Sequence, residues 1–163
     1  MKHAASLLAH LRDIMLLPVT MTIVIPYLID KPEESPSALI RIIGIVIMLG
    51  GITLFTYTVM LFKVIGRGTL APWSTKQRLV VTGPYRYCRN PMITGVFFVL
   101  TGETIFFWSS ALLTYTLLFF LINTVYFILV EEPGLEERFG GEYNEYKIHV
   151  PRWLPRVKPY FHL

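Results

Sequence analysis

The sequence has little charge and almost no cysteine. Asp, Glu, Lys and Arg together make up 16% of its 163 residues, too few to surround the core of a water-soluble domain of this length. Cys88 is the only cysteine, which excludes a disulfide scaffold. The sequence also lacks a Walker loop, a nucleophile elbow, a His or Cys cluster for zinc and a complete dinucleotide fingerprint. We therefore expect neither a soluble enzyme of a common class nor a bound metal.

Apolar residues are abundant and fall into long runs. They make up 53% of the chain, aromatic residues alone make up 14%, and the mean hydropathy is +0.52. The aromatic content excludes disorder. The composition therefore predicts a small integral membrane protein.

A helix needs about 20 largely apolar residues to cross about 30 Å of hydrocarbon. Four runs approach or reach this length: 14–29, 42–62, 92–108 and 111–130. The first contains Pro18 and Pro26, which predict a kink that neighbouring helices can accommodate. Ser109 and Ser110 leave only a tight turn between the last two runs, which predicts an antiparallel helical hairpin. The predicted fold is all-α, a single membrane domain of four spanning helices covering 1–163.

Basic residues are distributed unevenly over the connections. Of the 15 Lys and Arg residues, all but Lys31 and Arg41 lie in the N-terminal segment, the connection 63–91 or the tail 131–163. By the positive-inside rule these segments and both termini are cytoplasmic. The net charge of +4 is spread over these positions and needs no nucleic acid as a partner.

The connection 63–91 is too long for a simple linker. Its glycines and prolines break helices, and loops of this length are usually functional or disordered. Asn90 precedes a proline and is expected to be extended, whereas Pro91 can open a helix at its first position. The free N–H groups near Met92 and Ile93 would then suit a carboxylate. Alternatively, the arginines and tyrosines of this loop are ordinary interfacial anchors.

Two adjacent glutamates end the last apolar run. Glu131 and Glu132 stand at the C-terminus of a predicted helix, where the macrodipole opposes negative charge unless a cation offsets it. Either a ligand ammonium or the arginines of the loop 63–91 can supply that cation. Pro133 is expected to interrupt or kink the helix as it leaves the bilayer.

The tail after these glutamates carries an amphipathic stripe. Its members recur at helical spacing: Leu135, Phe139, Tyr143 and Tyr146. The stripe is expected to lie either on the membrane surface or on the loop 63–91. Gly140 and Gly141 weaken the helix, and the prolines at 151, 155 and 159 keep the end of the tail extended.

Glu103 is an ionisable residue inside the run 92–108. Such a residue is a candidate functional site by default, and a small four-span proton-coupled transporter that uses Glu103 is one alternative function. The other interpretation is that Glu103 is protonated or hydrogen-bonded to Thr101, Thr104 or Asn123. A non-catalytic membrane adaptor is a further alternative.

Two motifs occur in a specific order. The first is Gly83-Pro84-Tyr85-Arg86-Tyr87 followed by Arg89-Asn90-Pro91-Met92-Ile93-Thr94-Gly95. The second, after a hydrophobic hairpin, is Glu131-Glu132 followed by the run 139–146 and by Val150-Pro151-Arg152-Trp153-Leu154-Pro155. Together they resemble the isoprenylcysteine carboxyl methyltransferase and phospholipid methyltransferase group of integral membrane enzymes.

The resemblance implies a methyltransferase that uses S-adenosylmethionine and acts on an amphiphilic or lipid-like acceptor entering from the bilayer. The cofactor site would lie on the cytoplasmic face, between the loop 63–91 and the tail. By position, the implied cofactor contacts are Gln77, Arg78, Leu79, Val80, Tyr85, Asn90, Pro91, Met92, Ile93 and Glu131. The resemblance assigns no catalytic residue.

Two positions depart from the family pattern. Asn90 stands where the family usually has histidine, and an amide cannot shuttle protons near neutral pH. Phe127 stands where the isoprenylcysteine enzymes carry an arginine for the substrate carboxylate. Since burying an unpaired carboxylate is costly, we expect a neutral or cationic acceptor, such as an aminolipid, in preference to a prenylated cysteine. The alternative is that Arg89 or Arg152 reaches in from the loop or the tail to pair with a substrate carboxylate.

Overall fold

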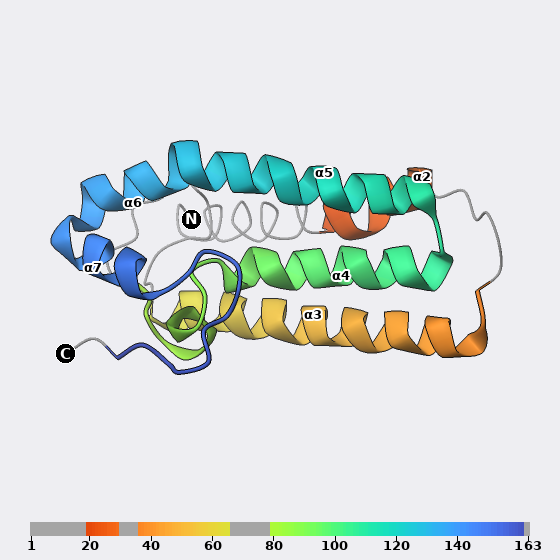
Figure 1. Ribbon diagram of the computed structural model, residues 1–163, viewed down its shortest axis with the longest axis horizontal. Coiled ribbons are helices and arrows are strands. Elements are labelled where there is room, and N and C mark those ends of the chain that lie inside the picture. Colours follow the sequence, from red (N-terminus) through yellow and green to blue (C-terminus); the bar gives the residue numbers. More distant parts are fainter. Residues whose placement is uncertain (1–18, 30–35, 66–78, 162–163) are drawn as a thin grey trace, which may run out of the picture.

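The computed structural model describes residues 19–29, 36–65 and 79–161, and the structural statements below concern these residues (Figure 1). They contain helices and turns but no strand, which confirms the all-α prediction for the described part. Along the chain the elements are η1 (Thr20–Val24), α2 (Ile25–Ile29), α3 (Ala38–Ile65), η2 (Gly83–Arg86), α4 (Pro91–Phe107), α5 (Ser110–Tyr126), η3 (Phe127–Glu131), α6 (Glu132–Phe139) and α7 (Gly141–His149).

Two of the described helices are long and apolar enough to cross a membrane. They are Ala38–Leu61 within α3, with a mean hydropathy of 2.4, and the continuous helix Ser110–Phe139, with a mean hydropathy of 2.0. The helices Thr20–Ile29 and Pro91–Phe107 are apolar but shorter. The number of spanning helices therefore stays a prediction.

Helix α3 is longer than its apolar run. It begins before Arg41 and continues past residue 62, although the sequence predicted a span over 42–62. The charged side chain limits the apolar run but does not end the helix, because Arg41 donates its N–H to the Ser37 carbonyl and its guanidinium lies over the Phe106 ring.

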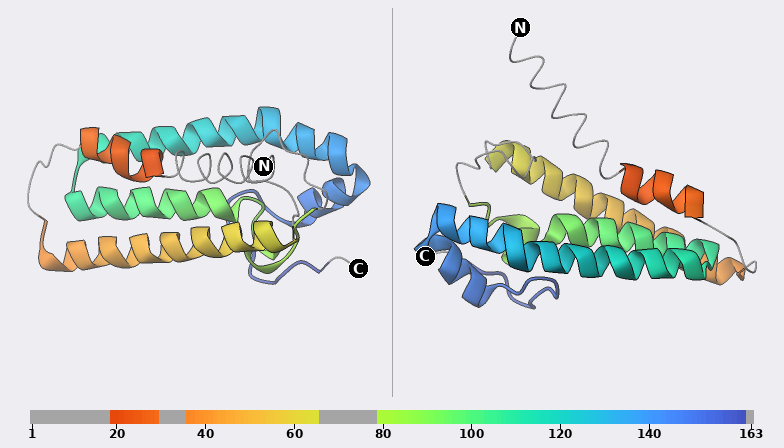
Figure 2. Two further views of the ribbon diagram at one scale, coloured as in Figure 1. Left: turned by 180° about the vertical axis from the view of Figure 1, so that it is seen from behind. Right: turned by 90° about the horizontal axis from the view of Figure 1, so that it is seen from above.

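Helices α3 and α4 lie side by side in the views of Figures 1 and 2, and glycines line their contact. A Cβ atom added at Gly51 would lie 2.6 Å from the Gly95 carbonyl oxygen, and one added at Gly102 would lie 2.6 Å from the Gly44 carbonyl oxygen. Since real Cβ contacts are not this short, only glycine at these positions lets the two backbones meet directly.

Helices α4 and α5 form the predicted hairpin. Trp108 takes left-handed backbone angles, φ 52° and ψ 49°, and Ser109 caps α5 by accepting the Leu112 N–H at 3.4 Å. The Oγ1 atoms of Thr104 and Thr116 lie 3.1 Å apart between the two helices. The hairpin thus brings the start of α4 to the same end of the molecule as the end of α5 (Figure 1).

The helix that leaves the bundle is not interrupted at Pro133, contrary to one form of the prediction. It widens into the π-helical turn η3, where the Glu132 N–H bonds to the Phe127 carbonyl, and the ribbon bends there (Figure 1). Pro133 then occupies the first turn of α6, where a missing N–H is tolerated.

The real break comes at Gly140, whose φ of 52° ends α6 and lets α7 fold back. Tyr143, Tyr146, Val150 and Tyr160 then form a buried cluster. The partly buried residues packed against it are Leu79, Val81, Leu135 and Phe139. Of the two predicted positions for the amphipathic stripe, the structure thus selects the one on the loop 63–91.

Candidate functional site

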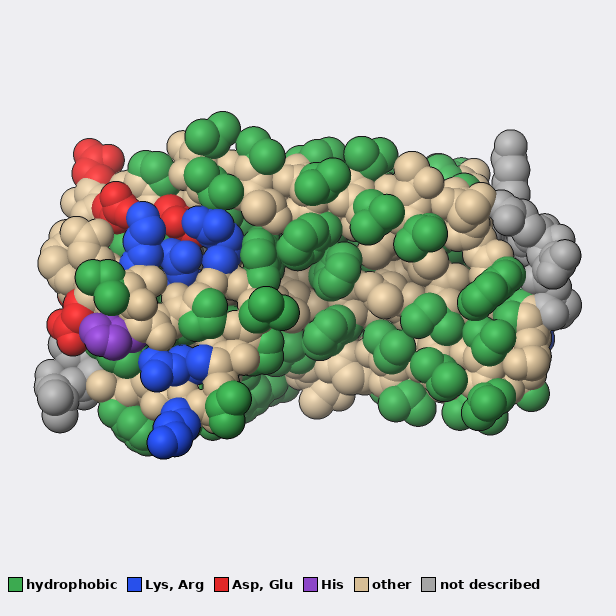
Figure 3. Space-filling view, in the orientation of Figure 1, with side chains coloured by type: hydrophobic (Ala, Val, Ile, Leu, Met, Phe, Trp, Pro, Cys, Tyr) green, Lys and Arg blue, Asp and Glu red, His purple; other side chains and the backbone are tan. Residues whose placement is uncertain are grey.

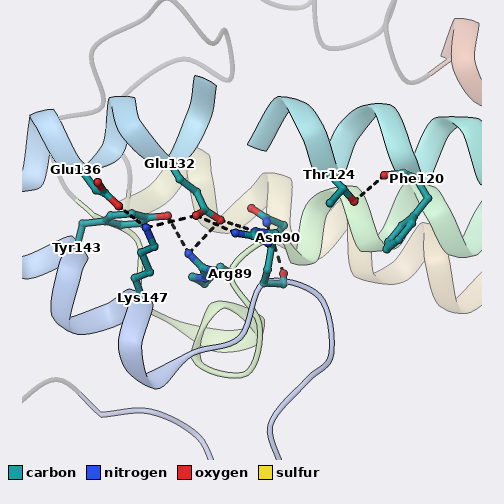
Figure 4. A network of polar contacts seen from close by, with 9 residues as sticks. Arg89, Asn90, Phe120, Thr124, Glu132, Glu136, Tyr143 and Lys147 are labelled. Atoms are coloured by element: carbon teal, nitrogen blue, oxygen red, sulfur yellow. Dashed lines mark hydrogen bonds and ion pairs between the residues drawn. The ribbon is translucent and has the colours of Figure 1, made fainter. Parts of the chain in front are cut away.

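Glu132 lies at the centre of a buried ionic network (Figure 4). Arg152 donates from Nε to Oε1 at 2.6 Å and from Nη2 to Oε2 at 3.1 Å. Arg89 Nη1 lies 3.1 Å from Oε1, and Lys147 Nζ lies 3.7 Å from Oε2. The side chains of Glu132 and Arg89 are only 5% and 9% exposed. One carboxylate therefore joins the loop before α4, helix α7 and the tail.

Positive charge exceeds negative charge in this network. Lys147 also pairs with Glu136, and Arg89 donates to the Tyr143 hydroxyl at 3.3 Å. The hydrogen bond to Glu132 raises the pKa of Arg152, which favours the charged form of its guanidinium. Two guanidinium groups facing one buried carboxylate make this end of the molecule suited to a further anionic group.

The loop and the tail are tied together through their backbones. Arg89 N–H donates to the Pro151 carbonyl at 2.9 Å, and the N–H groups of Arg156 and Tyr160 donate to the carbonyls of Tyr87 and Arg86, each at 3.0 Å. The buried Tyr146 hydroxyl donates to the Tyr85 carbonyl at 2.6 Å. Burial raises the pKa of both tyrosines, so both phenols stay neutral. Loop and tail thus behave as one unit.

The loop has its own steric requirement at its turn. Gly83 has a φ of 59°, and an added Cβ would lie 2.9 Å from Leu61 Cδ1 and 3.2 Å from the Tyr57 hydroxyl oxygen. A larger residue would be strained in both backbone and packing. This turn therefore seats the loop on the end of α3.

Helix α4 begins at Pro91, as predicted, but Asn90 is not extended. Its φ of −122° and ψ of 51° aim its carbonyl at Thr94, whose N–H and Oγ1 donate to it at 3.0 and 2.9 Å. The Asn90 side chain donates from Nδ2 to the Arg152 carbonyl at 3.5 Å. Met92 and Ile93 follow in the first turn, where backbone N–H groups lack intrahelical acceptors.

Aromatic side chains line the side of the site nearer the bundle. The ring centroids of Phe97 and Phe120 are 5.1 Å apart, and the Trp153 ring lies 5.2 Å from Phe120 and 5.6 Å from Phe127. Through these ring contacts, Trp153 packs the tail against α5 and η3. Trp153 Nε1 and Arg89 Nε are buried without an acceptor among the described residues.

The structure divides the predicted cofactor residues into groups. Gln77 and Arg78 lie outside the described residues. Leu79 packs on the tyrosine cluster, and Val80 and Tyr85 are buried. The side chains of these three residues therefore pack in the interior and hold the loop in place.

The remaining predicted residues lie nearer the ionic network. Asn90, Pro91, Met92 and Ile93 follow Arg89 directly at the start of α4. Glu131 is half-buried on η3, within electrostatic range of Tyr126, and precedes Glu132. The Arg89–Glu132 pair thus brings the two predicted blocks together.

Four residues of this site were not among the predicted cofactor contacts: Arg89, Glu132, Arg152 and Trp153. The sequence offered loop arginines as one of two partners for the paired glutamates, and the structure selects that partner for Glu132. The Arg-Trp pair lies between Pro151 and Pro155, and this flanking is the signal that could have marked it.

Glu103 lies in the second half of α4, away from these residues along the helix. Thr101, Thr104 and Asn123 donate instead to the carbonyls of their own helices. The predicted hydrogen bonds to Glu103 are therefore absent, and its Oε2 is buried without a partner in the described part of the chain.

A scan against known protein families matches residues 39–142 to the phospholipid methyltransferase family, which is more than half of the chain. Comparisons with curated proteins and with solved structures returned no match. The matched range runs from α3 into α7 and includes the loop, the start of α4 and both glutamates of the candidate site. The chain therefore belongs to the phospholipid methyltransferase family.

Proposed function

We propose that the protein is a membrane methyltransferase that uses S-adenosylmethionine to methylate a neutral or cationic amphiphile, such as an aminolipid. The observation that carries the proposal is the Arg89–Glu132–Arg152 network, which joins the loop before α4 to the tail at one end of an apolar helical bundle. The chain that forms it belongs to the phospholipid methyltransferase family. Figure 3 shows hydrophobic side chains along the bundle and charged ones gathered at that end.

The residues present fit the cofactor's charged groups. Its carboxylate suits the buried Arg89 Nε, which has no acceptor among the described residues, and the N–H groups of the first turn of α4. Its ammonium suits Glu131, the half-buried carboxylate beside the network. Glu132 is already bonded to Arg152 and Arg89. We propose Glu131 as the ammonium partner because it stands at the position that the family resemblance assigns to a cofactor contact.

When bound, S-adenosylmethionine supplies a methyl group that its sulfonium has already activated. The chain then has to position donor and acceptor and exclude water. The packed rings of Phe120, Phe127 and Trp153 form an apolar wall suited to water exclusion. Because the methyl group is already activated and the protein only positions the reactants and excludes water, the sequence needs no acid–base triad.

The same wall bears on the acceptor. Phe127 packs edge-to-face on Trp153 one turn before Glu131, and the nearby guanidinium groups of Arg89 and Arg152 are engaged by Glu132. With the cofactor carboxylate placed at Arg89, a second carboxylate on the acceptor would find no uncommitted cation among these residues, whereas an ammonium is attracted to aromatic faces. The arrangement therefore supports an aminolipid acceptor.

We propose a topology of four spanning helices with both termini and the site on the cytoplasmic side. The distribution of Lys and Arg supports this orientation. A lipid acceptor would then reach the site from the bilayer and the cofactor from the cytoplasm.

The test is calorimetric titration of the purified protein with S-adenosylmethionine, followed by incubation with labelled cofactor and lipid vesicles. Binding together with label in the lipid fraction supports the proposal. A folded protein that binds no cofactor refutes it. Proton-coupled flux in liposomes that is lost in Glu103→Gln, without methyl transfer by the parent, would establish the transporter instead.

A further inference from the structure

The last described segment, residues 151–161, exposes apolar side chains that no part of the described chain covers. Leu154 is 80% exposed and Val157 is 95% exposed, as much as or more than most lipid-facing residues of α3 and α5. Ile148 at the end of α7 is 81% exposed. Prolines at 151, 155 and 159 prevent this segment from folding into a helix that could turn these side chains inward. We refer to residues 151–161 as the strap.

The strap is held firmly despite this exposure. Its backbone bonds to the site loop through Pro151, Arg156 and Tyr160, and Arg156 Nη1 also donates to the His149 carbonyl at 2.8 Å. The Trp153 ring contacts Phe120 and Phe127. The exposed side chains therefore belong to an ordered surface.

The strap is also basic. No Asp or Glu follows Glu145 in the sequence, whereas the strap contains Arg152, Arg156 and Lys158. Arg152 is used by Glu132, but Lys158 is exposed, and Arg86 of the neighbouring loop lies with its guanidinium 4.7 Å from the centre of the Phe161 ring. Apolar side chains interleaved with basic ones are characteristic of segments that lie in the interface of an anionic leaflet.

The position of the strap agrees with its composition. Trp153 fixes it at the level of Phe127, and the next residues of η3, Ile128 to Val130, are exposed and apolar. Seen from above in Figure 2, the segment after α7 projects to one side of the bundle and runs back along it. The Trp153–Phe127 contact thus places the start of the strap beside η3, whose following residues are exposed and apolar.

We infer that the strap is a membrane-interface surface, which inserts Leu154 and Val157 among the headgroups of an anionic leaflet while Lys158 and Arg156 meet lipid phosphates. The partner that fits is an anionic lipid surface, because its phosphates would complement the basic residues of the strap and its acyl-chain boundary would cover the exposed apolar side chains. Neither the insertion of the apolar side chains nor the contact of the basic ones with phosphates requires cofactor binding or methyl transfer.

The test uses the full protein with a cysteine at the exposed tip. Because Cys88 is the only native cysteine and is buried, a Val157→Cys variant can be labelled selectively with an environment-sensitive nitrobenzoxadiazole dye. The labelled protein is placed in nanodiscs of phosphatidylcholine alone or of phosphatidylcholine with phosphatidylglycerol. We expect blue-shifted emission and quenching by lipid-borne nitroxide, both stronger in the anionic disc. Glu142→Cys on exposed α7 is the matched control and should stay quenched by aqueous iodide.

Lys158→Gln tests the electrostatic part. Loss of one cation at an anionic surface should weaken the preference for the anionic disc roughly fivefold. A dye at position 157 that stays open to iodide in both discs would refute the inference. Protection that disappears when the protein is diluted to one copy per disc would also refute it, because it would indicate contact between copies. Calorimetric titration of the same samples with S-adenosylmethionine reports on the proposed function separately.

Discussion

Glu131 and Glu132 are adjacent and chemically identical, yet the fold gives them different environments. The Glu132 side chain is 5% exposed and pairs with three cations, whereas Glu131 is half-buried on η3. A sequence reading predicts that a cation faces this pair but not which glutamate it meets. The π-helical turn directly before Glu132 rotates the following residues relative to a regular α-helix, and this local change of register is not visible in a hydropathy pattern.

Substitution of Glu131 tests its proposed role toward the cofactor. Glu131→Gln should lose about 1.5 to 3 kcal/mol of S-adenosylmethionine binding, the range for a hydrogen bond to a charged group. Folding should change little. Calorimetric titration measures the affinity, and Glu137→Gln on the exposed side of α6 is the control. Equal affinity in folded parent and Glu131→Gln proteins would remove Glu131 from the site.

Substitution of Glu132 tests the network itself. Glu132→Gln leaves Arg89 buried without its carboxylate, and breaking such a pair costs roughly 3 to 5 kcal/mol of unfolding free energy. Glu136→Gln removes only a partly exposed partner of Lys147 and should cost at most about 1 kcal/mol. Denaturant unfolding in one detergent compares the two variants. Similar losses in both would contradict the central position of Glu132.

Cys88 offers a measurement that needs no substitution. Burial raises the pKa of its thiol, so the reactive thiolate is scarce at neutral pH. We expect alkylation of the native protein by a maleimide to be slow and to become fast only after unfolding in denaturant. Rapid labelling of the folded protein, followed by mass spectrometry, would show that the loop before α4 is open.

At the scale of elements, the apolar runs of the sequence correctly indicated the positions of helices α3, α4 and α5, because the hydrophobicity of a helix that crosses a membrane is set by its own residues. The runs did not locate the ends of these helices. Helix α3 extends from Ala38 to Ile65 although the apolar run covers 42–62, since charged side chains can extend away from a helix that continues. The hairpin at Ser109 was predictable because two residues allow no other connection.

The close contact of α3 and α4 was not predicted, and two adjacent glycines test it. At Gly51 an added Cβ would meet the Gly95 carbonyl, whereas at Gly50 it would meet nothing within 4 Å. Gly51→Ala should therefore destabilise by about 1 to 3 kcal/mol through overpacking. Gly50→Ala should be neutral or stabilise by up to about 1 kcal/mol through helix propensity. Thermal unfolding of both variants decides this, and equal midpoints would contradict direct backbone contact.

At the scale of the whole molecule, the candidate site is assembled from segments far apart in the sequence. Local signals marked the Asn90–Pro91 helix start and the paired glutamates, because turns and helix ends depend on neighbouring residues. The contact of Trp153 with Phe120 and Phe127 depends on how α7 folds back after Gly140, which a single sequence does not specify.

The acceptor preference is a property of the assembled site. We expect labelled methyl groups to enter an aminolipid in preference to a prenylated cysteine carboxylate. Phe127 offers that carboxylate no cation, and Arg89 and Arg152 are already used by Glu132 and by the proposed cofactor carboxylate. Presenting both acceptors to one preparation measures the ratio. Predominant formation of the prenylcysteine methyl ester would overturn this prediction.

The Glu132 network also closes rings in the chain. Its hydrogen bond to Arg152 joins residues 20 positions apart, and its pair with Arg89 closes a longer ring that contains the whole α4–α5 hairpin. A secreted protein of this size would use a disulfide for such a closure, which this chain with its single cysteine cannot form. An ion pair closes such a ring only in the folded state. When the chain folds, closing the ring between Arg89 and Glu132 costs on the order of 3 kcal/mol of conformational entropy. The tail is thus fastened to the loop by noncovalent contacts, so its release would require no covalent bond to break.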